Sequence, residues 1–227
     1  MLGAMYLAEG KQRMLIDVSM TIKQGSVFRL GTPAVEIASR RFYNESEGEY
    51  ESTMISFSAH TATHVDLVFT EKRIDPRRMI GMGKLIDVTQ DFGELSRAVS
   101  GGGIRLDDVK HQVEIESGDF VFFRTDWSEF VGTMKYYDHP ELSLEVVQWL
   151  VSKNINAVGI DALGLGRDRR HGEYDRLLAR NNIFVIENLA NLSAIPKKKF
   201  NTYCFPLKIE NTDAIPARVV VEINENG

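Results

Sequence analysis

The chain has 227 residues, of which 43% are hydrophobic and 26% charged, and its formal net charge is −5. This length favours one domain covering residues 1–227, which buries a substantial core without cross-links. The negative charge argues against a nucleic-acid-binding surface, and the single cysteine excludes an intramolecular disulfide. Residues 1–20 contain no apolar run long enough for a signal peptide or a membrane span, so we expect a cytoplasmic protein without a membrane partner.

Short apolar runs bounded by turn residues predict strands along most of the chain. They cover residues 14–20, 83–89, 118–127, 155–163, 181–189 and 218–224. The run at 118–127 follows a turn signal and has an apolar centre, which indicates a buried central strand. Cys204 lies in a further strand-like stretch, and its aromatic neighbours favour a buried thiol over a catalytic one.

Helices are fewer, and two are predicted at residues 143–154 and 172–182. The first begins at Ser143, a favourable N-cap residue, and its apolar side chains recur at helical spacing. Each helix runs into a predicted strand, an order that is typical of α/β folds. These elements predict an α/β domain with a mixed, strand-rich sheet and few helices.

The stretch AHTATHVDLVFT at residues 59–70 holds two of the five histidines of the chain, with a carboxylate beside them. Whether the chain here is a strand or turns helical after His60, the spacing lets His60 and His64 share a face. Asp66 then joins them or orients one of them. Imidazole nitrogens and a carboxylate oxygen are preferred ligands of divalent metals, and the small Ala62 leaves room for an ion. The alternative is a pair of hydrogen-bonded strand histidines.

The other three histidines give weaker signals. His111 lies in a charged stretch and is expected at the surface, and His139 precedes a proline and is expected in a turn. His171 follows Arg-Asp-Arg-Arg and belongs either to the surface or to a site.

Several blocks of the sequence resemble the Putative cyclase family, which includes bacterial kynurenine formamidase and isatin hydrolase. The family signature is His-x-Gly-Thr-His-x-Asp-x-Pro-x-His, and the chain has HTATHVDLVFT at that place. Further blocks that resemble the family, in the same order, lie at 124–128, 138–163, 186–196 and 205–220. The resemblance therefore extends along most of the chain.

The resemblance implies a compact β/β/α fold of the swivelling type, assembled as homodimers or homotetramers. It also implies one or two divalent metal ions, zinc or manganese. The first ion would be held by His60, His64 and Asp66. A second ion would be held by Glu187 and by Asp175, which stands where the family has a histidine.

The chain departs from the family signature at three positions. Ala62 replaces the glycine, Val68 replaces the proline, and Thr70 replaces the last histidine, which the family uses as a general acid/base. A threonine cannot carry a proton near neutral pH as an imidazole can. His171 lies one helical turn before Asp175 and could substitute for either lost histidine. The candidate catalytic residues are therefore His171 and, at the position of the last signature histidine, Thr70.

These observations favour a metal-dependent hydrolase of a small amide, lactam or ester, related to arylformamidases and acting on C–N bonds. Phe69 and Trp127 are candidates for an aromatic wall against a flat substrate, or for core residues. One alternative is a non-catalytic oligomeric relative that binds a metal or a small molecule and has lost the general acid/base histidine. Another is a metal-dependent lyase or cyclase in which Thr70 helps to bind the substrate.

Overall fold

The computed structural model describes residues 5–7, 13–68, 74–89, 103–196 and 198–224. The strands are β1 (Met5–Leu7), β2 (Arg13–Asp17), β3 (Glu36–Asn44), β4 (Gly48–Ser56), β5 (His64–Asp66), β6 (Ile80–Asp87), β7 (Phe120–Arg124), β8 (Ala157–Ile160), β9 (Phe184–Glu187), β10 (Lys199–Pro206) and β11 (Ala214–Asn224). The α-helices of the described residues are α2 (Leu106–Val109), α3 (Leu144–Ser152) and α4 (Arg169–Arg180). Single 3-10 turns lie at Pro76–Met79, Trp127–Phe130, Met134–Asp138 and Leu192–Ala194.

The main sheet is mixed and closes on itself. Strands β6, β7, β8 and β9 are parallel neighbours, whereas β10, β11, β2 and β5 join by antiparallel pairing. The long strand β11 pairs with β5 at one end and with β2 at the other, which gives the sheet a barrel-like form. The prediction of a strand-rich α/β fold with a mixed sheet and few helices is confirmed.

Apolar side chains fill both faces of the parallel strands. On β7, Val121 and Phe123 face the helices, whereas Phe120 and Phe122 face the interior of the barrel. This strand therefore reads as a continuous apolar run because it is buried on both sides, as its sequence predicted.

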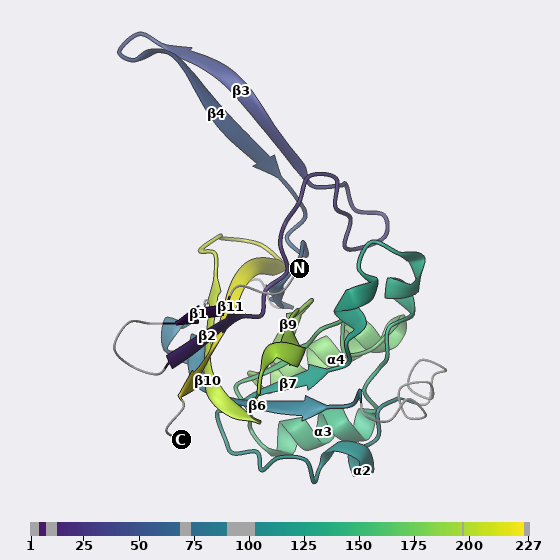
Figure 1. Cartoon of the computed structure of the whole chain (residues 1–227). Coiled ribbons are helices and arrows are strands. Elements are labelled where there is room, and N and C mark those ends of the chain that lie inside the picture. Colours follow the sequence, from purple (N-terminus) through teal and green to yellow (C-terminus); the bar gives the residue numbers. More distant parts are fainter. Residues whose placement is uncertain (1–4, 8–12, 69–73, 90–102, 197, 225–227) are drawn as a thin grey trace.

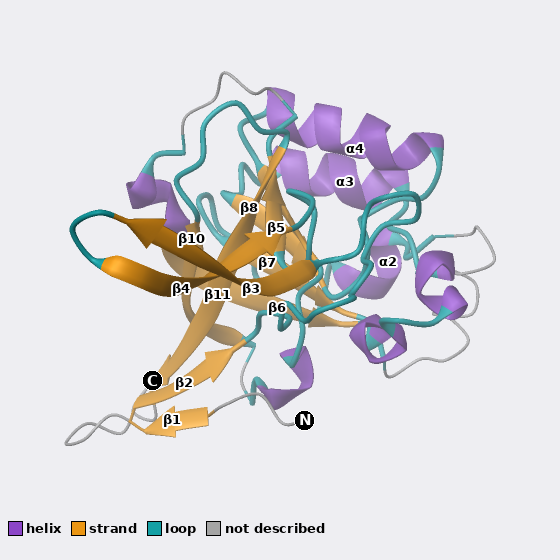
Figure 2. Cartoon of the chain, turned by 90° about the horizontal axis from the view of Figure 1, so that it is seen from above, coloured by secondary structure: helices purple, strands orange, loops and turns teal. Residues whose placement is uncertain are grey.

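Helices α3 and α4 lie side by side and cover one face of the sheet (Figure 2). Ser143 accepts a hydrogen bond from Val146 N at the start of α3, so the predicted cap forms. Helix α4 begins at Arg169, three residues before the predicted start, and this extension brings His171 into its first turn. None of the helices in the described part of the chain has the length and apolar character that crossing a bilayer requires.

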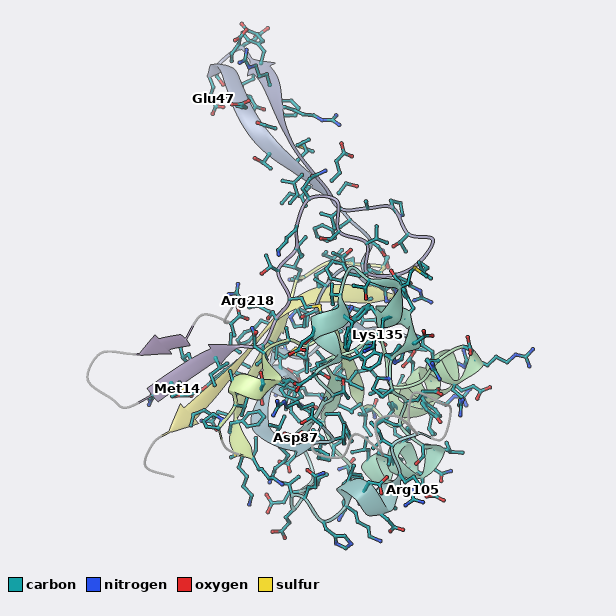
Figure 3. All side chains as sticks on the ribbon, turned by 45° about the vertical axis from the view of Figure 1, so that its right-hand side comes forward. Met14, Glu47, Asp87, Arg105, Lys135 and Arg218 are labelled. Carbon is teal, nitrogen blue, oxygen red and sulfur yellow. The ribbon has the colours of Figure 1, made fainter. Side chains whose placement is uncertain are left out.

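Strands β3 and β4 form a separate hairpin that projects far from the rest of the molecule, and we call it the arm (Figure 1). Glu47 lies at its far end (Figure 3). The two strands pair in register from Glu36↔Ser56 to Asn44↔Gly48. The arm was not predicted, because its strands carry charged and apolar side chains on both faces and so lack a strand-like alternation.

Candidate metal centre

His60, His64 and Asp66 come from a loop and the short strand that follows it. The chain leaves β4 at Ser56, passes His60 in a turn and enters β5 at His64. The predicted continuous strand and the predicted helical turn are therefore both wrong for His60. Strand β5 places His64 directly opposite Glu187 in its antiparallel pairing with β9, so the backbone register brings these two side chains together.

The side chains of this first group converge on one point. His60 Nδ1 lies 3.2 Å from His64 Nε2 and 3.2 Å from Asp66 Oδ1, and His64 Nε2 lies 3.5 Å from the same oxygen. Their potential ligand atoms all fall within 4.8 Å of one another. The geometry brings together the three residues of the predicted first metal site.

Hydrogen bonds behind the two imidazoles fix which nitrogen faces the group. His64 Nδ1 donates to Ala62 O at 2.8 Å, so its Nε2 lone pair points toward the other ligands. His60 Nε2 lies 3.0 Å from Asp213 Oδ2, which leaves Nδ1 for the group. Asp213 was not predicted, because it follows the distant strand β10 and no local pattern connects it with His60.

The backbone conformation at Ala62 is one that glycine adopts easily, which gives a reason for the glycine of the family signature at this position. Its φ is 54°, in the left-handed region that costs an L-residue about 1–2 kcal/mol. The conformation turns the Ala62 carbonyl onto His64 Nδ1, where Asn188 Nδ2 also donates to it at 2.9 Å. The small side chain was predicted to leave room for an ion, and this stays a prediction. The described contacts show a role for the Ala62 carbonyl, which accepts hydrogen bonds from His64 and Asn188.

A second group joins His171, Asp175 and Glu187. His171 and Asp175 lie one turn apart on the same face of α4, with His171 Nε2 3.5 Å from Asp175 Oδ2. The same nitrogen is 3.7 Å from Glu187 Oε1, at the carboxyl end of β9. The potential ligand atoms of these residues also lie within 4.8 Å of one another. His171 therefore stands among candidate ligands, and its predicted catalytic role stays a prediction.

Glu187 lies between the two groups and is 2% exposed. Its Oε2 is 3.3 Å from His64 Nε2, while its Oε1 faces His171. The two groups are thus adjacent, with one carboxylate presenting an oxygen to each.

Several carboxylate oxygens of these groups are buried without a hydrogen-bond partner among the described residues. They are both oxygens of Asp66, Oδ1 of Asp175 and Oε1 of Glu187. Burying such atoms unpaired costs about 1–3 kcal/mol each, more when they are charged. A cation at each group would bind them, so the residues present fit one or two divalent metal ions.

The charge balance of the protein alone also favours a cation. Burial and the charge of Asp66 raise the pKa of Glu187 to about 7 and that of Asp175 to about 8. Burial disfavours charge on His64, but its close contacts with the carboxylates of Asp66 and Glu187 outweigh burial and raise its pKa to about 10. Burial likewise opposes the ionised form of Asp66, yet the contacts with His60 and His64 outweigh it and lower its pKa. Without a metal, protons occupy the positions that a cation would fill.

Both groups open into a cavity of about 320 Å³. It is lined by Arg29, His60, Tyr137, Asp138, His139, Leu163, Gly166, Arg167, Asp168, His171 and Glu187. The sequence did not single out Tyr137, Leu163 or Arg29 for this cavity, because they come from a 3-10 turn and two loops that are separate in the chain. His139 was predicted in a turn, and its burial was not predicted, although its side chain is only 3% exposed.

The remaining predicted site residues lie elsewhere. Trp127 is buried in the core, where its indole Nε1 donates to Tyr136 O, so it takes the alternative role of a core residue and does not line the cavity. Phe69 and Thr70 lie outside the described residues, and their roles stay predictions.

The model of the Putative cyclase family matches residues 16–167. The chain belongs to the Putative cyclase family. The cyclase-family relatives include isatin hydrolase of Roseibium aggregatum, 25% identical over 219 residues that cover 85% of this chain and 82% of that protein. They also include kynurenine formamidase of Salinibacter ruber, 23% identical over 219 residues, or 91% of this chain and 96% of that protein.

A solved structure described as a potential metal-dependent hydrolase with cyclase activity has a TM-score of 0.73 and 27% identity to this chain. The match covers 93% of this chain and 100% of that one. Together with the two ligand groups, this neighbour supports a divalent metal in the cyclase-family fold described here.

Proposed function

We propose that this protein is a metal-dependent hydrolase of a small amide, lactam or ester, with zinc or manganese as its metal. The observation that carries the proposal is the pair of adjacent ligand groups opening into one cavity. Its relatives support the same class of reaction, because their names describe a hydrolase and a formamidase.

The residues of the site have two roles in this proposal, which are to bind the metal ions and to orient the ligand side chains. A divalent cation held by either group supplies Lewis-acid chemistry, polarising a substrate carbonyl and making water more acidic. His60, His64 and Asp66 would hold one cation, and His171, Asp175 and Glu187 would hold another. Asp213 and the Ala62 carbonyl fix the rings of His60 and His64, so that the binding nitrogens need no rearrangement.

The cavity supports a small substrate with one apolar side. Its volume of about 320 Å³ is at the low end for small-molecule sites. Tyr137 and Leu163 are its apolar lining residues, and they stand beside charged residues of both signs, among them Arg29 and Asp138. We propose an arylformamidase-like reaction on a C–N bond, in which water attacks the carbonyl of such a substrate.

The first experiment is elemental analysis of the protein as purified, beside a His60→Ala/His64→Ala variant. We expect one or two equivalents of zinc or manganese in the native protein, and a loss of at least one in the variant. His111→Ala is the matched control, because this exposed histidine lies outside both groups. Native protein that stays free of metal after reloading would contradict the proposal.

The second experiment is a screen of formamides, lactams and esters in ¹⁸O-labelled water. Hydrolysis places one labelled oxygen in the carboxylic acid product, whereas a lyase or cyclase gives an unlabelled product. A metal-loaded protein that converts none of these compounds would favour the non-catalytic alternative.

A further inference from the structure

His139 is the histidine of the cavity that belongs to neither ligand group. His60, His64 and His171 are candidate ligands, and His111 is exposed. His139 lines the same cavity as the ligand groups and is almost fully buried. A buried imidazole beside a candidate reaction site has a chemical use only if one of its nitrogens is free and faces the cavity.

The backbone fixes the tautomer of His139. Its Nδ1 lies 3.0 Å from Pro140 O, and a carbonyl oxygen can only accept, so Nδ1 carries the hydrogen. In the neutral ring the lone pair is then on Nε2. This nitrogen has no hydrogen-bond partner among the described residues, and it is not one of their fully buried unpartnered atoms. Nε2 therefore opens toward the cavity with its lone pair available.

The surroundings keep the ring neutral. Burial lowers the pKa of His139 to about 4, and the charges of Arg167 and His171 act in the same direction, against the Pro140 hydrogen bond and Glu141. These groups lie in the loop after β8, on α4 and in the segment of His139 itself, and the carboxylates of Asp138 and Asp168 line the same cavity. At neutral pH the ring is therefore uncharged, so Nε2 keeps its lone pair, and the protonated form gives up a proton readily.

The segment that carries His139 is tied to its neighbours, which holds the ring in place. Leu142 N donates to Leu165 O at 2.8 Å. The buried carboxylate of Glu141 accepts from Arg167 N at 2.8 Å and from Arg170 Nη2 at 2.9 Å. A catalytic side chain works best when its supports are already in position before the substrate binds.

We propose that His139 is the proton-transfer residue of this site, in the role that Thr70 cannot fill. The assignment rests on the proposed hydrolase function. The Nε2 lone pair accepts a proton from water as the water oxygen bonds to the substrate carbonyl carbon. The imidazolium then donates that proton to the leaving nitrogen or oxygen as its bond to the carbon breaks. One water is consumed, His139 returns to its neutral form, and no oxidant or reductant is needed.

The kinetic test is His139→Asn, because an asparagine amide can still donate to Pro140 O but offers no base. We expect kcat to fall about 100-fold or more, the usual size of general acid–base catalysis, with KM, metal content and Tm close to wild type. His111→Asn is the matched control and should leave all four unchanged. A His139→Asn enzyme with wild-type kcat would overturn the assignment.

Chemical rescue separates proton transfer from a structural role. We expect His139→Ala to regain activity when free imidazole is added, because a small base can enter the opened cavity, and the control without imidazole to stay slow. A loss that imidazole leaves unchanged while Tm also drops would mean that His139 acts as a packing residue.

A measurement that needs no substrate distinguishes this inference from the proposed function. In ¹⁵N-labelled metal-loaded protein, the imidazole nitrogen chemical shifts should report a neutral His139 ring with the hydrogen on Nδ1 at pH 7. A hydrogen on Nε2, or a charged ring, would overturn the assignment whatever the substrate screen gives. A wild-type protein that hydrolyses nothing would instead contradict the proposed hydrolase function.

Discussion

At the scale of single residues, Glu187 is the side chain of the second ligand group that also contacts the first. Its carboxylate faces His64 with one oxygen and His171 with the other. Asp175, in contrast, belongs to the second group alone. The two carboxylates therefore differ in whether they also contact the first group.

This difference predicts two metal stoichiometries. We expect Asp175→Asn to lose at most one equivalent of metal, because the group of His60, His64 and Asp66 remains intact. We expect Glu187→Gln to weaken binding at both positions, by about tenfold or more at each. Titration of the metal-free variants with manganese measures both effects. If Glu187→Gln binds two equivalents of manganese with wild-type affinity, the prediction that Glu187 affects both positions is wrong.

The raised pKa values predict that metal uptake releases protons. In the protein alone the pKa of Glu187 is about 7, that of Asp175 about 8 and that of His64 about 10. A ligand must lose its proton to bind a metal, so the apparent affinity should rise as pH increases through these values. Calorimetric titration at pH 7 in two buffers of different protonation enthalpy counts the protons released. Identical heats in both buffers would contradict the prediction.

The residues alone identified the part of the site that is local, and the family resemblance added Glu187, Asp175 and His171. The other residues around the site were not assigned. His60, His64 and Asp66 lie within seven positions, so almost any backbone geometry brings them together. Asp213 and Arg29 approach the same place only through the tertiary fold, and no periodicity marks them. His139 was read as a turn residue because its neighbour is a proline, and burial is not visible in such a short pattern.

At the scale of elements, the loop after β8 decides how closely α4 and β9 can approach. A Cβ added at Gly164 would lie 2.5 Å from His171 Nδ1 and 3.0 Å from Glu187 Oε1. The loop thus has room for the second ligand group only while this position lacks a side chain.

Gly164→Ala should therefore disturb the second group without changing any ligand. We expect a loss of stability of about 1–3 kcal/mol, as for other overpacked sites, together with weaker binding of one metal equivalent. Gly172→Ala is the matched control. Its Cβ meets only the flexible end of Arg176, and alanine favours the helix by about 1 kcal/mol. Thermal unfolding and metal titration of both variants test the prediction.

The elements themselves were largely predictable, because their signals are local and strong. The runs at 83–89, 118–127, 155–163 and 181–189 became the parallel strands β6, β7, β8 and β9. The closure of the sheet through β11 was not predictable from these runs. It depends on pairing between segments at opposite ends of the chain, which no local pattern specifies.

At the scale of the whole molecule, the arm is the feature that stands apart. Its strands pair with each other in a sheet of their own, and Tyr43, Met54 and Ile55 on it are exposed. Two-stranded hairpins are marginally stable in isolation. We therefore expect the arm to add little to the stability of the barrel, and no residue of either ligand group lies on it.

Removing the arm tests this separation. Because Glu36 and Ser56 are paired neighbours, residues 36–56 can be replaced by a two-glycine linker. We expect Tm to change by only a few degrees and the metal content to stay the same. A collapse of Tm would show that the arm belongs to the folding unit. Light scattering on the full and shortened chains would also test the homodimer or homotetramer predicted from the sequence.

The closure of the sheet through β11 also sets the order in which the molecule can assemble. Strand β5 pairs with β11 from Asp66↔Ala214 to His64↔Pro216, across most of the length of the chain. Contacts between such distant segments form slowly, because a long loop must close before they gain any energy. A growing chain therefore holds His64 and Asp66 for most of its synthesis without β9 and β11, the two strands that pair with β5. The first ligand group has both neighbouring strands in place only after β11 has been synthesised.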